Sequence, residues 1–237
     1  MATHAILLGG GSGTRMKNPV NKSFILLEGK PLIAYSLLAF QHHPEVNHIV
    51  VVIHKDWVQE LMTWVNRFGI TKINKIVEGG KERQDSVRNG LDVITQSNPK
   101  PTDIVLIHNA ANPLITTELI SECIRSAQQN HASVAAYRIK DTIKRVQSDG
   151  KIVETLQREE LWGMQTPQCV EYELFLRAHL QAAKEGFYGT DDVQLVERLK
   201  VQPVVVDCGY ENIKITTPED LPFAEKILQK RKEKNDS

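Results

Sequence analysis

Short continuous runs of apolar residues recur along the chain, and segments with helical periodicity separate them. The clearest runs are residues 5–8, 48–53, 103–108 and 132–137. A strand that helices cover on both faces has this composition, because both of its faces are buried. Strands that alternate with helices predict an α/β, Rossmann-like fold with a mostly parallel sheet and helices on both faces.

The segments between the apolar runs predict the helices. Residues 31–40 are expected to form one with Pro31 at its first position, and Thr116 is expected to cap a helix over residues 118–129. A closing helix is predicted with Thr217 as its cap and Pro218 as its first residue. The other predicted helices span residues 56–67, 82–94, 170–184 and 191–199, and short strands are predicted at residues 75–77 and 203–206.

Residues 142–147 and 151–156 alternate between polar and apolar side chains around Asp149-Gly150, which predicts a β-hairpin. A two-stranded hairpin is marginally stable alone in water. It therefore packs on its own domain or projects as an arm onto a partner chain. We predict a single domain over residues 1–237, with an arm at about residues 139–160.

Composition excludes several classes of protein. The 29 basic and 29 acidic residues balance, so no overall charge attracts nucleic acid or an anionic membrane. No apolar run approaches the length of a membrane span, and the N-terminus does not resemble a signal peptide. The three cysteines are widely spaced and odd in number, which favours reduced thiols in the cytoplasm. We predict no site at which side chains alone hold a metal.

The run Gly9-Gly10-Gly11-Ser12-Gly13-Thr14 follows the first predicted strand, and Arg15 and Lys22 come after it. Glycines expose backbone N–H groups that bind anions. The loop lacks the Gly-Lys-Ser/Thr ending of a Walker loop and the last glycine of a dinucleotide-binding fingerprint. A surface loop is the alternative, but the preceding buried strand favours a polyphosphate site, most simply for a nucleoside triphosphate.

Four further polar clusters follow strands or occupy loops. In open α/β sheets ligands bind beyond the carboxyl ends of the strands, so these clusters are candidate site segments. They are Glu78–Ser86, His108–Pro113, Arg158 with Leu161–Gln168, and Gly189–Asp192 with Asn212–Thr216.

Together these segments resemble the cytidylyltransferases that act on polyol phosphates, most strongly the 2-C-methyl-D-erythritol 4-phosphate cytidylyltransferase family, with ribitol 5-phosphate cytidylyltransferases as near relatives. The motifs that carry the resemblance are GGKERQDS at residues 79–86, LWGMQTPQ at 161–168, TDD at 190–192 and NIKITTPEDL at 212–221. They occur in the family's order over nearly the whole chain.

The resemblance implies that an acceptor phosphate attacks the α-phosphorus of CTP, with Mg²⁺ bound mainly through the CTP phosphates, in the pathway to isoprenoid precursors. It implies that Arg15 and Lys22 are catalytic, and that the hairpin arm reaches across a homodimer. The implied nucleotide-binding residues are Leu8, Gly9, Gly10, Gly11, Gly13, Thr14, Gly80, Lys81, Ser86 and Ala110. The implied acceptor-binding residues are Asn109, Asn112, Thr142, Arg158, Thr166, Thr190 and Lys214, of which Thr142 and Arg158 would serve the site of the partner chain.

The chain departs from the family pattern at two places. The family's H-D-A-A/V-R-P run reads His108-Asn109-Ala110-Ala111-Asn112-Pro113 here, so an aspartate and an arginine are both replaced by asparagine. The loss of one negative and one positive charge leaves the local net charge unchanged, which suggests that the two residues were exchanged as a pair. The usual Pro-Lys-Gln has become Asn21-Lys22-Ser23, in a shortened loop.

These departures leave alternatives to methylerythritol 4-phosphate as the acceptor. Ribitol 5-phosphate, or another pentitol or sugar phosphate used for cell-surface polymers, is one. A nucleotide-binding protein that does not catalyse is a second, and a sugar-1-phosphate nucleotidyltransferase that uses another base is a third.

Overall fold

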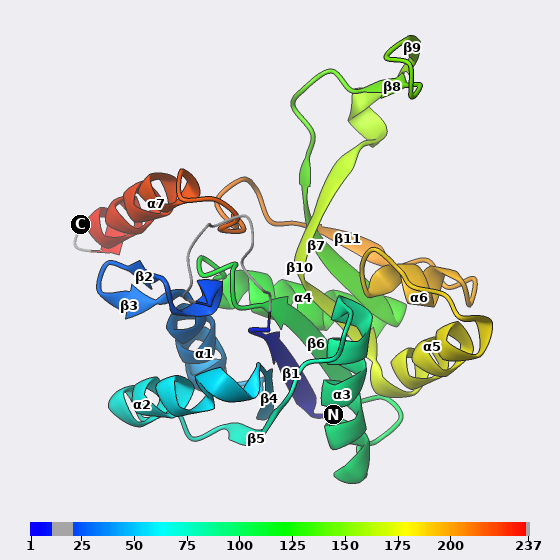
Figure 1. Ribbon diagram of the computed structural model, residues 1–237. Helices are drawn as coiled ribbons and strands as arrows, with labels where there is room; N and C mark the ends of the chain where they lie inside the picture. The colour runs from blue at the N-terminus through cyan, green and yellow to red at the C-terminus, as the bar shows by residue number, and fades with distance from the viewer. Residues whose placement is uncertain (11–20, 236–237) are drawn as a thin grey trace.

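A seven-stranded sheet forms the centre of the molecule in the computed structural model, which describes residues 1–10 and 21–235 (Figure 1). Its strands are β1 (Thr3–Leu8), β4 (His48–Val52), β5 (Ile73–Val77), β6 (Ile104–Asn109), β7 (Ala132–Arg138), β10 (Trp162–Glu171) and β11 (Val204–Asp207). Their order is β11-β7-β10-β6-β1-β4-β5. Only β10 among them runs antiparallel to its neighbours, β6 and β7. The predicted α/β fold with a mostly parallel sheet is confirmed.

Helices cover both faces of the sheet, because successive strand residues point to opposite sides. Ala5 and Leu7 of β1 pack in one hydrophobic cluster, and Ile6 between them packs in another. The first cluster includes side chains of α1 (Leu32–His42), α2 (Val58–Phe68) and α4 (Thr117–Asn130). The second includes side chains of α3 (Arg83–Gln96), α5 (Tyr172–Glu185) and α6 (Val193–Glu197).

The C-terminal helix α7 (Asp220–Asn235) lies beside a small hairpin of β2 (Leu26–Leu27) and β3 (Lys30–Pro31) (Figure 1). Leu27, Ile215 and Ala224 are buried together in a third apolar cluster. The described residues also form three short 3₁₀ helices: η2 (Lys22–Phe24), η3 (Lys55–Trp57) and η4 (Arg158–Glu160).

The predicted hairpin is present as β8 (Lys144–Val146) and β9 (Ile152–Thr155), which pair antiparallel. Figure 1 shows it projecting from the body at the end of two long connections. Every residue of the two strands is exposed, including the apolar Val146, Ile152 and Val153. The arm therefore has an apolar surface that its own chain does not cover.

The structure corrects several predicted boundaries. Val170 does not begin a helix: it belongs to β10, where it pairs with Val105 of β6, and α5 begins at Tyr172. Pro31 lies in β3 and precedes the first residue of α1. The predicted helix 191–199 is only the short α6.

The closing helix also begins later than predicted. It starts at Asp220, and Thr217 and Pro218 form a turn before it. The Asp220 carboxylate, not the Thr217 hydroxyl, accepts the backbone N–H groups of Thr216 and Thr217, at 2.7 and 2.9 Å. By contrast, Thr116 caps α4 as predicted, by accepting the backbone N–H of Leu119 at 3.2 Å. Within residues 1–10 and 21–235, no helix combines the length and apolar character that a membrane crossing requires.

Candidate active site

The ends of three parallel strands meet at one edge of the sheet. The N–H of Gly9, just after β1, donates to Val52 O at the end of β4 at 2.8 Å. The N–H of Ala110, just after β6, donates to Leu8 O at 2.9 Å. Leu8, Gly9 and Ala110 are thus brought together at the carboxyl edge, where ligands bind in open α/β sheets.

Lys22 is held beside this edge by its two neighbours. Asn21 Nδ2 and Ser23 Oγ both donate to Gly9 O, at 3.0 and 3.1 Å. Asn21 Oδ1 also accepts the N–H of Ser23 at 2.9 Å. The shortened Asn21-Lys22-Ser23 loop therefore fixes the backbone of Lys22 next to the end of β1.

Gly10 is the last residue of the glycine run within the described part of the chain. Among the described residues, no atom lies within 4 Å of a Cβ placed on Gly10. The other predicted residues of this loop lie outside the described part of the chain, and their placement stays a prediction: Gly11, Gly13, Thr14 and Arg15.

The turn between β5 and α3 requires glycine. A Cβ on Gly80 would lie 2.2 Å from Asp85 Cβ, so no side chain fits there. The N–H of Gly80 donates to Ser86 Oγ at 3.0 Å, and that hydroxyl donates to Glu82 O at 3.2 Å. Gly80 and Ser86 are therefore joined directly, and Lys81 beside them is exposed.

His108 anchors the loop that follows β6. Its Nε2 lies 3.0 Å from Asn112 O. A carbonyl can only accept, so Nε2 carries the proton and Nδ1 accepts from the Thr166 hydroxyl at 3.0 Å. Complete burial lowers the pKa of His108 to about 4, although the bond to Asn112 O opposes this. His108 is thus a neutral, structural group, as expected for a histidine at the end of a buried strand.

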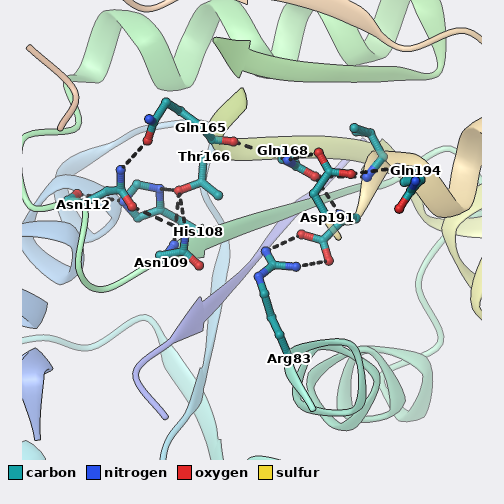
Figure 2. Close-up of polar contacts among 11 residues, drawn as sticks. Arg83, His108, Asn109, Asn112, Gln165, Thr166, Gln168, Asp191 and Gln194 are labelled. Carbon is teal, nitrogen blue, oxygen red and sulfur yellow. Dashed lines mark hydrogen bonds and ion pairs between the residues drawn. The ribbon is translucent and has the colours of Figure 1, made fainter. Parts of the chain in front are cut away.

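Asn109 and Asn112, at which the chain departs from the motif it resembles, contact each other. Asn109 Nδ2 lies 3.4 Å from Asn112 Oδ1 and 3.5 Å from Thr166 Oγ1 (Figure 2). The buried Asn112 donates to Gln165 Oε1 at 3.0 Å and to Asn212 O at 3.4 Å. The two asparagines therefore form a neutral amide pair in this chain. Because Nδ2 of Asn109 points to Asn112, its Oδ1 lies on the opposite side of the amide.

The segment after β11 completes this part of the site. Asn212 Nδ2 donates to Thr166 O at 2.8 Å, and the N–H of Ile215 donates to Ala111 O at 2.7 Å. Lys214 lies between these anchors and is exposed. The structure therefore brings Asn109, Asn112, Thr166 and Lys214 to one region.

Thr190 lies in a second region, which β10 and α3 hold in place. Its N–H donates to Gln194 Oε1 at 2.7 Å. Just after it, Arg83 of α3 forms a bidentate ion pair with the buried Asp192, at 2.6 and 2.8 Å (Figure 2). Gln168 Oε1 accepts the N–H groups of Asp192 and Val193, at 2.9 and 3.0 Å, and its Nε2 donates to Asp191 at 3.1 Å.

Thr142 and Arg158 form no hydrogen bond or ion pair with the other candidates that the structure describes. Thr142 precedes β8 and is exposed, and Arg158 lies in η4 between β9 and β10. Arg158 is half exposed, donates to Lys140 O at 3.2 Å and lies 3.7 Å from a carboxylate oxygen of Glu159.

The sequence did not single out the side chains that hold these segments together, namely Arg83, Gln84, Gln165, Gln168 and Asn212. The sequence contains only a weak indication that these side chains connect distant segments. Gln168 is a polar residue in a strand that is otherwise buried at that end, with 2% of its surface exposed. A buried glutamine needs hydrogen-bond partners, but its partners come from a loop 23 to 25 residues away.

A mostly parallel sheet, a glycine-rich segment after its first strand and a second glycine turn before α3 define the class as an α/β nucleotidyltransferase. The family model for 2-C-methyl-D-erythritol 4-phosphate cytidylyltransferase (IspD) matches residues 3–230. The chain belongs to this family.

Individual relatives agree with the family match. The chain is 42% identical over 226 residues to the 2-C-methyl-D-erythritol 4-phosphate cytidylyltransferase of Clostridium novyi, covering 95% of this chain and 96% of that protein. It is 41% identical over 231 residues to the protein of that name from Halalkalibacterium halodurans, with 98% and 99% covered. Its fold resembles the crystal structure of 4-diphosphocytidyl-2C-methyl-D-erythritol synthase from Anaerococcus prevotii, with a TM-score of 0.83, 29% identity and 96% of each chain covered.

Proposed function

We propose that this protein transfers CMP from CTP to 2-C-methyl-D-erythritol 4-phosphate, a step in isoprenoid precursor synthesis, and releases pyrophosphate. Membership of the family over nearly the whole chain supports the reaction class. One structural observation supports the proposal: the backbone of Lys22 is fixed beside Gly9, at the edge where β1, β4 and β6 end.

In the proposed reaction an oxygen of the acceptor phosphate attacks the α-phosphorus of CTP. A new P–O bond forms while the bond from the α-phosphorus to the bridging oxygen breaks, and pyrophosphate leaves with the electron pair. Such transfers depend on positioning and charge stabilisation, not on a covalent nucleophile. Lys22 and Arg15 supply positive charge to the phosphates, and the backbone N–H groups of Gly9, Gly10, Gly11, Gly13 and Thr14 bind them.

The base and the acceptor occupy opposite sides of the triphosphate in this proposal. Gly80, Lys81 and Ser86 hold the cytosine ring and ribose together with Ala110. The acceptor binds to Asn109, Asn112, Thr166, Thr190 and Lys214, with the partner's Thr142 and the partner's Arg158. Asn109 Oδ1 can accept from a polyol hydroxyl, because its Nδ2 is directed toward Asn112 and Thr166.

The proposal includes Mg²⁺, which binds mainly through the CTP phosphates and neutralises their charge. Mg²⁺ prefers phosphate oxygens and water, with one or two protein ligands. Two carboxylates beside Thr190 are engaged with other groups: Asp191 with Gln168 and the N–H of Gln194, and Asp192 with Arg83. The neutral Asn109 amide offers one oxygen but no charge. This donor set fits a metal that arrives with the nucleotide.

We also propose a homodimer through the arm, in the cytoplasm. The exposed Val146, Ile152 and Val153 of the hairpin support a partner chain that covers them. Three free cysteines, two of them buried, are compatible with a reducing compartment.

The test is pyrophosphate release by the purified protein with Mg²⁺, each of the four nucleoside triphosphates and a panel of polyol and sugar phosphates. Release is expected only when CTP, Mg²⁺ and methylerythritol 4-phosphate are present together, and EDTA is expected to abolish it. A preference for UTP or GTP would contradict the proposal. CTP binding in calorimetry without release from any acceptor would show a non-catalytic nucleotide-binding protein.

Ribitol 5-phosphate is the second candidate acceptor. The neutral Asn109–Asn112 pair supports ribitol 5-phosphate as an alternative acceptor, because these two residues lie in the proposed acceptor region and differ from the family pattern. A higher kcat/KM for ribitol 5-phosphate than for methylerythritol 4-phosphate in the same panel would establish it.

A further inference from the structure

Three consecutive residues at the start of α3 each bond to the segment 187–192, more than 100 residues away. Arg83 forms the bidentate pair with Asp192, at 2.6 and 2.8 Å. Asp85 Oδ1 accepts from the Tyr188 hydroxyl at 3.3 Å. Between them, Gln84 bonds to two backbone groups. The first turn of α3 therefore forms hydrogen bonds to residues 187, 188, 189 and 192 of this segment.

Gln84 makes the most specific of these contacts. Its Nε2 donates to Phe187 O at 3.0 Å, and its Oε1 accepts the N–H of Gly189 at 2.9 Å. One amide thus pairs with the backbone on both sides of Tyr188. This double contact fixes the position and the direction of the chain that leads into Thr190.

The two ends of this connection lie in different parts of the proposed site. The first turn of α3 also carries Ser86, whose hydroxyl bonds to Gly80 of the base-binding turn. The segment 187–192 contains Thr190, a proposed acceptor-binding residue. Transfer between two bound substrates requires the attacking oxygen to lie in line with the bond that breaks. A misplacement of about 1 Å can cost about 10²-fold in rate.

We propose that Gln84 is a positioning residue that holds Thr190 at a fixed separation from the Gly79–Gly80 turn. This separation keeps the bound acceptor in line with the bond of the nucleotide that breaks. This inference rests on the proposed function. Gln84 contacts neither substrate in it and acts only through the backbone of residues 187–189.

The variants are chosen to separate hydrogen bonding from side-chain volume. Gln84→Met keeps the length of an unbranched side chain but removes both bonds. Gln84→Glu keeps an acceptor for the N–H of Gly189 but places an oxygen against Phe187 O. Arg88→Ala is the matched control, because Arg88 lies on the same helix and pairs with Asp92 in an ordinary (i, i+4) surface contact.

The kinetic measurement is pyrophosphate release with the acceptor varied, alongside CTP affinity by calorimetry. Each lost hydrogen bond is expected to matter modestly, so we expect about a tenfold fall in kcat/KM for the acceptor in Gln84→Met. Gln84→Glu is expected to fall in the same direction. CTP affinity is expected to stay within about twofold, and Arg88→Ala to match the wild type. An unchanged kcat/KM in both Gln84 variants would overturn the proposal, as would equal losses in Arg88→Ala.

Amide hydrogen exchange tests the same proposal without turnover. The N–H of Gly189 is expected to exchange faster in Gln84→Met than in the wild type. CTP is expected to slow exchange across residues 187–190 in the wild type but not in the variant. Equal CTP protection in both proteins would refute the coupling. If the wild type releases no pyrophosphate, the proposed function fails, while the exchange experiment still decides the role of Gln84.

Discussion

Lys22 is the one proposed catalytic cation that the described residues place, and its position depends on the bonds from Asn21 and Ser23 to Gly9 O. Lys22→Met keeps those bonds, because neither involves the lysine side chain. We expect kcat to fall by about 10²–10³ with an unchanged melting temperature, since a charge on the developing transition state is lost. Arg15→Ala is expected to behave alike.

The control is Lys226→Met, which removes an exposed lysine of α7. Steady-state kinetics and thermal unfolding of the three variants provide the comparison. A Lys22→Met enzyme as fast as the wild type would remove Lys22 from the mechanism.

His108 links stability to pH because burial lowers its pKa to about 4 in the folded protein. The unfolded chain binds a proton near pH 6.5, whereas the folded protein does not. The contribution of His108 to the stability of the folded state is therefore fully present above pH 6.5, and it is lost as the pH falls toward 4.

Between pH 7 and pH 5 this residue is expected to lower the free energy of unfolding by about 2 kcal/mol. Urea titrations of the wild type and of His108→Gln at both values of pH measure the difference. His179, whose pKa burial also lowers to about 4, remains in both proteins. The prediction fails if the two proteins lose the same free energy on acidification.

At the scale of elements, the turn from β5 to α3 joins a strand end to a helix start with no room for a side chain at Gly80. Gly80→Ala must displace Asp85 or the turn itself. We expect a loss of about 1–3 kcal/mol in stability, as for other overpacked sites. We also expect weaker CTP binding, because Ser86 and the N–H of Gly80 separate.

Gly10→Ala offers the comparison, because its Cβ would meet no atom of the described residues within 4 Å. Its melting temperature without ligand is expected to match the wild type. Thermal unfolding with and without CTP measures both effects, since a ligand that binds the folded state raises the melting temperature. A Gly80→Ala protein with normal stability and a normal CTP-induced shift would contradict this account of the turn.

The strand β10 shows how one element assembles the site. It enters the sheet between β6 and β7, and its pairing register with β7 shifts between Met164 and Gln168. Such an irregularity redirects side chains locally. Here Gln165 reaches Asn112 in the loop after β6 and Thr166 reaches His108 within β6, while Gln168 reaches the segment before α6.

At the scale of the whole molecule, the arm predicts sites that two chains share. If the partner's Arg158 completes each site, Arg158→Ala removes a side chain that the arm supplies to the other chain's site. Lys22→Met removes a side chain from the site of its own chain. Each variant alone is expected to be nearly inactive. A dimer that contains one of each has one intact site, formed by the Lys22 pocket of one chain and the Arg158 arm of the other.

Mixing the two variants after reversible dissociation is expected to restore about a quarter of wild-type activity, because about half the dimers are mixed and each has one working site. Sedimentation establishes the dimer, and pyrophosphate release measures the recovery. No recovery from a mixture that contains mixed dimers would show that each chain builds its own site.

The sequence by itself determined the layers of the fold, most helices and strands, the hairpin and the segments that carry the site. These depend on local patterns: burial on both faces gives continuous apolar strands, one buried face gives helical periodicity, and Asp149-Gly150 gives a tight turn. The Gly80–Ser86 contact also spans only six residues. A resemblance to a known family supplied the assigned roles.

Only the tertiary structure decided where β10 lies and which side chains connect the segments. The sequence predicted no strand over residues 161–168 and placed Val170 at a helix start, because their strand pairing is with β6 and β7 far along the chain. The bonds of Gln84 to Phe187 and Gly189, and of Thr166 to His108, span from 58 to 105 residues. Local periodicity does not encode strand order, so contacts that depend on that order appear only once the sheet is assembled.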